Sequence, residues 1–262
     1  MSTEVWALGD AYEPYVGRWS RLVAADFLRW LEVQDGCQWA DVGCGTGAVT
    51  EAVLRFAAPA RVIGIDQSEG FLAHARAHVT DPRAGFQVGT ATALPLGDGE
   101  MDATISGLVL NFVPEPERAV AEMTRVTRTG GVIGAYVWDY ADGAQFIRHF
   151  WDAAVELDPQ ARDLYEGTRF PLCHPDALAS LFTGGGLAGV EVSAIDVPTP
   201  FRDFDDYWLP FLGGQGPAPG YAVSLAEDRR ADLRELIRTR LPIEADGQIA
   251  LTARAWAVRG RR

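Results

Sequence analysis

Short apolar runs and amphipathic stretches alternate along the first half of the chain. The runs expected to form buried strands are residues 37–42, 61–65 and 132–138. The stretches with apolar side chains at helical spacing are residues 20–33, 48–56, 68–79 and 117–127. Strands that alternate with helices are typical of an α/β fold with a parallel sheet.

A glycine-rich turn separates the first of these strands from the helix that follows it. Gly43, Gly45 and Gly47 let the backbone turn sharply and approach a ligand without a Cβ atom in the way. Thr46 is expected to cap the helix at residues 48–56. A strand leading into such a turn, with helical N–H groups behind it, predicts a site for a nucleotide-like cofactor.

The turn leaves the identity of that cofactor open. Its spacing, Gly43-x-Gly45-x-x-Ala48, fits the dinucleotide-binding fingerprint. Asp66 ends the second strand about twenty residues later, where a carboxylate would bind the ribose hydroxyls of NAD or of another adenosine-containing cofactor. These features predict an adenosine-type site, and an NAD-dependent oxidoreductase is one alternative.

Several segments, taken in order, resemble the motifs of the class I S-adenosylmethionine (SAM) dependent methyltransferases. They are the glycine turn at residues 41–47, the end of the second strand at 64–68, a third strand and turn at 86–96, a fourth strand at 101–106, and a helix and turn at 119–131. Over residues 35–140 the chain resembles the small-molecule methyltransferases of the ubiquinone-biosynthesis type. The resemblance implies a doubly wound, Rossmann-like sheet of seven mostly parallel strands, with an antiparallel last strand and a partly helical cap.

The resemblance also implies which residues bind SAM. Asp41 and the glycine turn would hold the methionine part, and Asp66 would hold the ribose. The adenine would lie against residues 90–92, although Thr90 stands where many relatives have an acid that accepts a hydrogen bond from the adenine. The implied cofactor-binding residues are Tyr15, Arg18, Asp41, Gly43, Cys44, Gly45, Gly47, Asp66, Gln67, Thr90, Ala91, Thr92, Ser106 and Gly107.

The N-terminal segment has two interpretations. Residues 1–17 are polar and contain proline and glycine, which predicts a mobile arm before the helix at 20–33. Arg18 and three aromatic residues lie near the junction. Either they close over the cofactor, with Arg18 meeting the methionine carboxylate, or they anchor a surface arm. The aromatic residues are Tyr12, Tyr15 and Trp19.

The regular alternation loosens after Trp138. Residues 146–157 and 175–182 predict helices, and residues 190–197 and 249–258 predict the two strands of an antiparallel hairpin that closes the sheet of this fold. Between those strands, residues 201–221 are rich in glycine and proline, which is typical of a functional or mobile loop. The expected division is an N-terminal arm and helix at 1–35, a SAM-binding core at 36–140, and cap segments with the last two strands at 141–262, in one domain overall.

Aromatic residues are concentrated in this second half. Phe, Trp and Tyr number 27 in the chain, and fifteen of them lie between Tyr136 and Tyr221. They form either a second hydrophobic core or the lining of a pocket for an apolar or aromatic methyl acceptor, where ring faces also favour a nearby sulfonium cation. The expected pocket residues are Trp138, Phe146, Trp151, Trp208 and Phe211.

The catalytic residues are not identified by the sequence. Methyl transfer from SAM requires a base only when the acceptor carries its proton into the reaction. Weak candidates for that base are His149, His174 and Tyr207, with Tyr140 and Asp139 as alternatives. Asn111, at the edge of the sheet, either faces cofactor or substrate or makes an ordinary turn contact.

Composition narrows the range of partners. The net charge of −13 and the pI of about 4.7 argue against a nucleic-acid partner. The three cysteines and the pair His74 and His78 lack metal-site spacing, and Cys44 is expected to be a small turn residue rather than a nucleophile. With no signal-peptide pattern and no membrane-spanning run, a cytoplasmic protein with a small-molecule partner and no membrane partner is expected, and a homodimer is left open.

A third functional alternative comes from another class. A methyltransferase-like fold can bind SAM without using its chemistry, as a cyclase or as a ligand-binding protein. The SAM-binding motifs would be the same in such a protein, so the residues quoted above do not distinguish it from a methyltransferase.

Overall fold

The structure is a computed structural model that describes residues 13–214 and 216–262. Two compact units make up these residues. Unit 1 contains the segment up to Trp19, Trp138–Pro171 and Asp196–Arg254, and unit 2 contains Ser20–Val137, Leu172–Ile195 and Ala255–Arg262. Tyr12, for which the sequence left a cofactor contact and a surface anchor as alternatives, lies outside the described residues.

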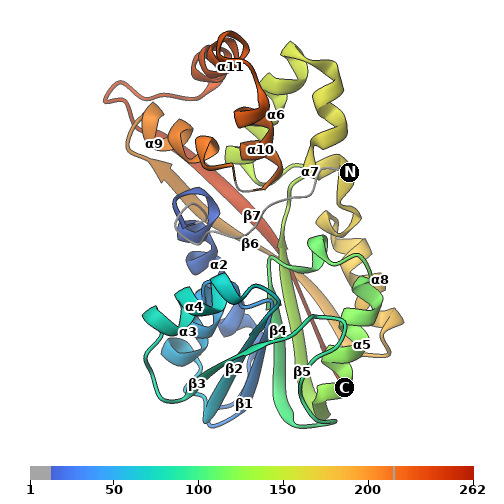
Figure 1. The fold of residues 1–262 in the computed structure, drawn as a ribbon. Helices are drawn as coiled ribbons and strands as arrows, with labels where there is room; N and C mark the ends of the chain where they lie inside the picture. Colours follow the sequence, from blue (N-terminus) through green and yellow to red (C-terminus); the bar gives the residue numbers. More distant parts are fainter. Residues whose placement is uncertain (1–12, 215) are drawn as a thin grey trace. The chain divides into compact units, whose positions relative to one another are not determined.

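Seven strands form one sheet in the order β3-β2-β1-β4-β5-β7-β6 (Figure 1). They are β1 (Gln38–Val42), β2 (Arg61–Asp66), β3 (Ala84–Val88), β4 (Met101–Gly107), β5 (Thr127–Trp138), β6 (Ala188–Phe201) and β7 (Ile249–Arg261). β1 pairs in parallel with β2 and with β4, β2 pairs with β3, and β4 pairs with β5. Successive strands are added toward one edge of the sheet from β1 to β3 and toward the other edge from β4 onward, so the order switches between β1 and β4, which is where open α/β sheets bind their ligands.

β7 runs antiparallel to β5. In unit 2 the Gly130 N–H donates to the Arg262 carbonyl, and the Arg262 N–H donates to the Gly131 carbonyl. In unit 1 the Asp139 N–H donates to the Arg254 carbonyl at 2.9 Å. The residue numbers therefore increase along β5 while the numbers of their partners on β7 decrease, which is the antiparallel pattern.

Ion pairs follow the same reversed register between β7 and β6. Arg259 pairs with Glu191 at 3.0 Å in unit 2, and Arg254 pairs with Asp196 at 2.7 Å in unit 1. Moving five positions along one strand moves the partner five positions back along the other. The predicted seven-stranded α/β sheet with an antiparallel closing pair is therefore confirmed.

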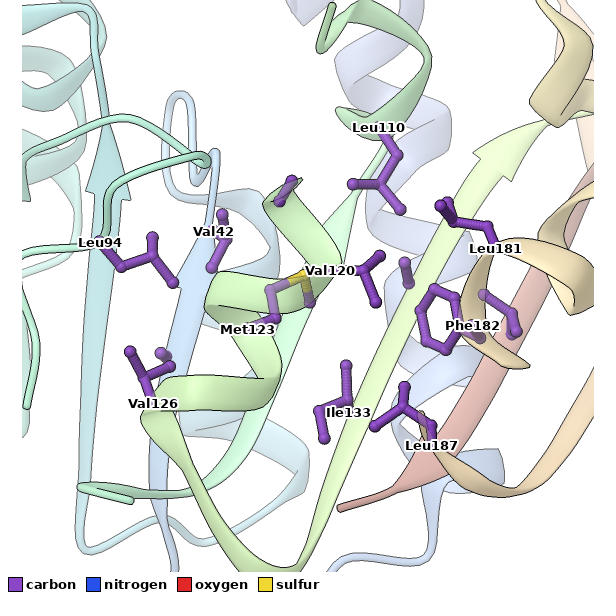
Figure 2. Close-up of a cluster of buried hydrophobic side chains, with 14 of the residues drawn as sticks. Val42, Leu94, Leu110, Val120, Met123, Val126, Ile133, Leu181, Phe182 and Leu187 are labelled. Atoms are coloured by element: carbon purple, nitrogen blue, oxygen red, sulfur yellow. The ribbon is translucent and has the colours of Figure 1, made fainter. Parts of the chain in front are cut away.

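Helices cover both faces of the sheet within unit 2. They are α2 (Arg18–Leu31, which begins in unit 1), α3 (Ala48–Phe56), α4 (Glu69–His78), η2 (Leu110–Phe112), α5 (Pro116–Val126) and α8 (Pro175–Gly184). Figure 2 shows Val120 of α5 and Phe182 of α8 beside Ile133 of β5. On the other face, the Phe27 ring of α2 lies 4.9 Å from the ring of Tyr136. Ile133 and Tyr136 are an odd number of positions apart, so alternation along β5 directs them to opposite faces.

Unit 1 is built around aromatic side chains. Its remaining elements are η1 (Glu13–Gly17), α6 (Gln145–Leu157), η3 (Pro159–Leu164), α7 (Glu166–Arg169), α9 (Phe204–Trp208), η5 (Leu209–Gly213), α10 (Pro217–Ser224) and α11 (Glu227–Arg240), with η4 (Pro171–Cys173) at its boundary. Phe150 stacks on Phe211 with ring centroids 4.5 Å apart, and Trp138 meets Phe146 edge-on at 6.1 Å. Close ring contacts of this kind stabilise a core beyond the area they bury.

Two expectations about secondary structure are wrong. Residues 13–17 form a π-helix rather than an arm, and Tyr15, Val16 and Trp19 are buried. The segment 201–221 is mostly helical, because Asp203 caps α9 by accepting the Asp206 N–H and prolines occupy the first turns of η5 and α10.

One helix, α11, was not predicted from the sequence. α11 buries only Leu233 and Ile237, which leaves a weak helical pattern among charged residues.

In the described part of the chain, every helix is too short or too polar to cross a lipid bilayer.

Candidate functional site

The turn after β1 wraps around the end of β2. The Gly43 and Cys44 N–H groups both donate to the Ile65 carbonyl, at 2.7 and 3.0 Å. Gly43, Gly45 and Gly47 have φ values of 73°, 54° and 92°, the left-handed region that favours glycine. Gly47 is the N-cap of α3, and no side chain caps this helix. The prediction that Thr46 caps α3 is therefore wrong, because the left-handed Gly47 separates Thr46 from the first helical residue.

The three glycines have different surroundings. A Cβ atom on Gly43 would lie 2.4 Å from Val109, and one on Gly47 would lie 3.1 Å from Val79. A Cβ atom on Gly45 would have nothing within 4 Å. Gly43 and Gly47 are thus required by packing, whereas Gly45 presents its backbone to open space, as a turn that receives a ligand must.

Cys44 is a packing residue of the turn. Its side chain is buried, and a Cβ atom on Gly64 would lie 2.8 Å from its sulfur. Burial raises the pKa of the Cys44 thiol well above its usual value, and the nearby carboxyl of Asp41 raises it further. A thiol held protonated and covered is a poor nucleophile.

Asp66 connects the turn to the start of α4. Its Oδ2 accepts the Gly45 N–H at 3.0 Å, and its Oδ1 accepts the Ser68 N–H at 2.8 Å. Burial raises the pKa of this carboxyl, and the backbone hydrogen bonds from Ser68 and Gly45 oppose that rise. A carboxylate has about four lone-pair sites, so each Asp66 oxygen retains acceptor capacity for a ligand hydroxyl. Ser68 also caps α4 as predicted, accepting the Phe71 N–H.

Asp41 lies beneath the turn and is fully buried. Its Oδ2 accepts the Thr50 hydroxyl at 2.7 Å, and among the described residues its Oδ1 has no hydrogen-bond partner. Burial raises the pKa of Asp41 to about 7, the Thr50 hydrogen bond lowers it, and the charge of Asp66 raises it. A buried carboxylate oxygen without a donor is costly, and a ligand that brings a donor or a positive charge would relieve that cost.

The residues implied for the adenine lie beyond the ends of β2 and β3. Gln67 and Thr90 are exposed, and Ala91 and Thr92 are half-buried. A bridge between Thr90 and Ala93 closes the turn, in which the two threonine hydroxyls are 3.5 Å apart. The threonine side chains are thus available to an adenine edge, although Thr90 offers a hydroxyl in place of a carboxylate.

At the end of β4, the candidate site is offered backbone groups rather than side chains, because the Ser106 hydroxyl is already bonded and the next residue is Gly107. The Ser106 hydroxyl is buried and donates to the Val42 carbonyl of β1 at 2.8 Å. A Cβ atom on Gly107 would lie 2.7 Å from the Tyr136 hydroxyl, so glycine is needed there for close packing. Leu108 follows with φ 63°, a conformation that a side chain of this kind rarely adopts and that is found at ligand sites more often than elsewhere.

Tyr15 and Arg18 belong to unit 1, whereas the residues above belong to unit 2. Tyr15 is buried with its ring 5.3 Å from that of Phe211. The Arg18 guanidinium lies 4.3 Å from the Trp19 ring and 4.8 Å from the Phe201 ring, and it donates to Asp206. Both residues therefore have anchoring contacts inside unit 1, which fit the interpretation as anchors. Their contact with the cofactor stays a prediction.

The predicted pocket residues are buried members of the unit 1 core. They are Trp138, Phe146, Trp151, Trp208 and Phe211, each at most 3% exposed. The Trp151 indole donates to the buried carboxylate of Glu166. Their mutual ring contacts fit the interpretation as a second core, and a role in lining a substrate pocket stays a prediction.

The candidate bases have different environments. His149 is half-buried, and desolvation lowers the pKa of its imidazole. His174 is exposed at the start of α8. The buried Tyr207 hydroxyl donates to the Phe146 carbonyl at 2.7 Å, and burial raises its pKa well above its usual value. Tyr207 therefore stays protonated at neutral pH, and its hydroxyl is already used as a donor.

His74 and His78 stack on α4 with ring centroids 4.0 Å apart. Nδ1 of His78 is 2.8 Å from the His74 carbonyl oxygen. Among residues 13–214 and 216–262, no group of three or more His, Cys, Asp or Glu side chains is arranged to hold a metal ion.

Three residues near the turn were not predicted from the sequence. Thr50 supports Asp41, Val109 packs on Gly43, and the Tyr136 hydroxyl lies against Gly107. Thr50 lies on the mostly apolar helix α3, where a buried hydroxyl signals a polar partner. Val109 and Tyr136 carry no local signal, because the turn after β4 places Val109 and the pairing of β4 with β5 places Tyr136.

Comparisons with known proteins concern the same region. Residues 40–135 match a family described as a methyltransferase domain. A 37.1 kDa protein in transposon TN4556 of Streptomyces fradiae is 36% identical over 146 residues, which cover 51% of this chain and 42% of that protein. A demethylmenaquinone methyltransferase of Shouchella clausii is 36% identical over 115 residues, covering 41% of this chain and 48% of the relative. The chain spans about half the length of the curated relatives it matches.

Solved structures share the fold over nearly the whole chain. The YcgJ protein of Bacillus subtilis superposes with a TM-score of 0.62 at 16% identity, covering 92% of this chain and 98% of that one. The [4+2]-cyclase SpnF superposes with a TM-score of 0.55 at 21% identity, covering 93% and 80%. Likeness at such identities establishes the fold and leaves the chemistry to the site.

Proposed function

We propose, from the methyltransferase domain that residues 40–135 carry, that this chain transfers a methyl group from SAM to a small apolar or aromatic molecule. The observation that carries the proposal is the pair of contacts made by Asp66, which holds the Gly45 and Ser68 N–H groups and keeps acceptor capacity on both oxygens. A carboxylate in this position suits the two hydroxyls of an adenosine ribose.

The remaining features of the turn suit the other parts of SAM. Gly45 presents backbone to open space beside the Asp66 carboxylate, as close approach of a ligand requires. Asp41 offers a buried oxygen that lacks a donor, which an ammonium group or a bridging water would supply. When bound, SAM supplies an activated methyl group on a positively charged sulfur.

Charge favours SAM over NAD. A dinucleotide places a pyrophosphate at the turn, and this group carries negative charge. Here the Asp66 carboxylate lies at the turn, where its Oδ2 accepts the Gly45 N–H. Like charges brought together in a buried site are unfavourable, whereas the cationic groups of SAM are attracted to it.

The protein's contribution to methyl transfer is mainly positioning. Asp66 and the glycine turn orient the cofactor, and burial around Asp41 and Ser106 excludes water from the end of the sheet. Holding two reactants in the geometry of reaction lowers the barrier without acid or base chemistry. The base, if the acceptor needs one, stays a prediction among His149, His174 and Tyr207.

A second candidate function is supported by one likeness. SpnF, whose name describes a [4+2]-cyclase, shares this fold over 93% of the chain. The contacts of Asp66 and Asp41 would serve a cyclase that keeps SAM bound without consuming it. Formation of S-adenosylhomocysteine separates the two functions.

Calorimetric titration with SAM, S-adenosylhomocysteine and NAD tests the cofactor. We expect micromolar affinity for the two sulfur ligands and none for NAD. Incubation with SAM and a panel of small phenols, anilines and thiols then tests the reaction, with S-adenosylhomocysteine as the product measured. Binding of NAD alone would exclude the proposal, and binding of SAM without turnover of any acceptor would favour the second candidate.

A further inference from the structure

Asn111 lies just beyond the end of β4, in the short helix η2. The neighbouring Leu110 is 1% exposed and belongs to the hydrophobic cluster of unit 2, where Figure 2 shows it on the same side of the sheet as Leu181. Leu110 thereby fixes the helix that carries Asn111. The side chain of Asn111 is held as well, because its Nδ2 donates to the sulfur of Cys173 at 3.8 Å.

The other end of this amide lacks a partner. Oδ1 of Asn111 is buried and accepts no hydrogen bond from any described residue. Buried amide oxygens nearly always have a donor, because leaving one without a donor is costly. A donor group brought by a ligand would satisfy Asn111, whose own amide is already held by Cys173 and needs no rearrangement.

The segment before Asn111 touches the cofactor turn. Val109 packs against Gly43, and Leu108 is held in a left-handed conformation by its N–H bond to the Tyr136 carbonyl. β4 is also the direct neighbour of β1, with Asp41 opposite Ile105. Asn111 thus follows the strand at the reversal of the sheet order, on a segment that is fastened to the turn.

We propose that the Asn111 side-chain oxygen accepts a hydrogen bond from the O–H or N–H group that receives the methyl group. This inference rests on the proposed function and adds the substrate class, which is a small apolar molecule with a protic oxygen or nitrogen. Asn111 is then a positioning residue that turns a lone pair of the acceptor atom toward the methyl carbon.

The reaction at this site conserves its atoms and electrons without a further reactant. A lone pair of the acceptor oxygen or nitrogen forms the bond to the methyl carbon, and the carbon–sulfur bond breaks with its electrons passing to sulfur. The acceptor's proton is released to water. The Asn111 amide does not take that proton, because a neutral amide is an acceptor of hydrogen bonds and a very weak base.

The composition of the chain offers a direct probe, since Asn111 is its only asparagine. Protein labelled with nitrogen-15 at asparagine will show one side-chain amide pair by NMR. In the complex with S-adenosylhomocysteine, we expect this pair to shift when phenol is added and to shift much less with anisole, which has the same ring and no donor. Equal responses to the two probes, or no response to phenol and to aniline, would overturn the inference.

Kinetics of Asn111→Leu provide the second readout. We expect kcat/KM for a phenol or aniline acceptor to fall about tenfold or more, with the SAM dissociation constant unchanged within about twofold. Cys173→Ala removes the partner of Nδ2 and keeps the oxygen, so we expect a smaller fall than in Asn111→Leu, of at most about threefold.

The outcomes separate this inference from the proposed function. A loss of SAM affinity in Asn111→Leu would assign the residue to the cofactor and overturn the inference. A lower melting temperature with unchanged kcat/KM would make Asn111 a structural residue and also overturn it. If the wild-type chain binds neither SAM nor S-adenosylhomocysteine, the proposed function itself fails.

Discussion

Asp66 Oδ2 accepts the backbone N–H of Gly45 at 3.0 Å, across 21 positions of the chain. This hydrogen bond links the end of β2 to the turn that follows β1 in the candidate site. The carboxylate therefore shapes the site as well as offering acceptors to a ligand. Removing it should change cofactor binding through both effects.

We predict that Asp66→Ala lowers the affinity for SAM by more than about tenfold. The variant loses the acceptors for the ribose hydroxyls and frees the Gly45 and Ser68 N–H groups. Calorimetry with SAM measures the effect. Asp98→Ala is the control, because Asp98 is an exposed partner of Arg125 at the far end of unit 2's β4 and should leave binding unchanged. Near-normal affinity in Asp66→Ala would remove the ribose assignment.

A pair of glycine variants separates backbone strain from ligand contact. Gly45 and Gly36 have φ values of 54° and 76°, and a Cβ atom on either would meet nothing within 4 Å. We expect each alanine variant to be destabilised by about 1 kcal/mol, measured by urea unfolding. Only Gly45→Ala should lose SAM affinity, by at least about tenfold, because its Cβ atom would occupy the open side of the turn. Equal affinities in the two variants would mean that Gly45 does not face the cofactor.

The stability of the folded chain should depend on the ionisation of Asp41. Burial raises the pKa of Asp41 from 3.8 to about 7, so between these values the folded protein holds a proton that the unfolded chain has released. The stabilising contribution is therefore complete below the unfolded value and is lost as the pH rises through the folded one, by up to about 4 kcal/mol.

Urea unfolding at about pH 5 and about pH 8 measures this dependence. Asp41→Asn cannot titrate, so we expect its unfolding free energy to change less over the interval than that of the wild type. Parallel pH profiles for the two proteins would show that Asp41 ionises normally.

Thr50 supports the same carboxyl. Its hydroxyl donates to Asp41 at 2.7 Å and lowers the pKa of that group. Thr50→Val keeps the shape and removes the donor, so we expect a loss of about 1–3 kcal/mol at pH 8, where Asp41 is ionised. The loss should shrink at pH 5. A loss that is the same at both pH values would indicate a packing defect instead.

In unit 1, Tyr207 is expected to be structural. Its hydroxyl donates to the Phe146 carbonyl in the aromatic core. Tyr207→Phe should lower the unfolding free energy by about 1 kcal/mol and leave kcat for any acceptor unchanged. If kcat falls by about a hundredfold while stability holds, Tyr207 is the base after all.

The parallel part of the fold could be predicted because its signals are local. The apolar run that became β1 and the helical pattern that became α3 each lie within a few residues, and residues 48–56 are helical over the predicted range. The glycine turn could likewise be predicted from the spacing of Gly43, Gly45 and Gly47. Ser68 could be predicted as the N-cap of α4, because a serine just before a helix accepts a backbone N–H of the first turn, here that of Phe71.

Other parts depended on contacts that the local sequence does not show. α11 buries too little to leave a pattern, and the helices of residues 201–221 are set by the Asp203 cap and by aromatic packing in unit 1. In the site, Thr46 was predicted as the cap from its residue type, but the left-handed backbone at Gly47 excludes it. The unpartnered state of the Asn111 side-chain oxygen among the described residues could not be predicted, because the surroundings of this amide include residues far away in the sequence, such as Cys173.

The close fit between Gly43 and Val109 also constrains how this protein can have diverged. A Cβ atom on Gly43 would lie 2.4 Å from Val109, so a larger residue at one position demands a smaller one at the other. Homologous chains should therefore vary at these two positions together, with alanine at the first accompanied by a reduced side chain at the second. By the same reasoning, Val109→Ala should recover the part of the stability that Gly43→Ala loses to this clash, while the strain of a side chain at φ 73° remains.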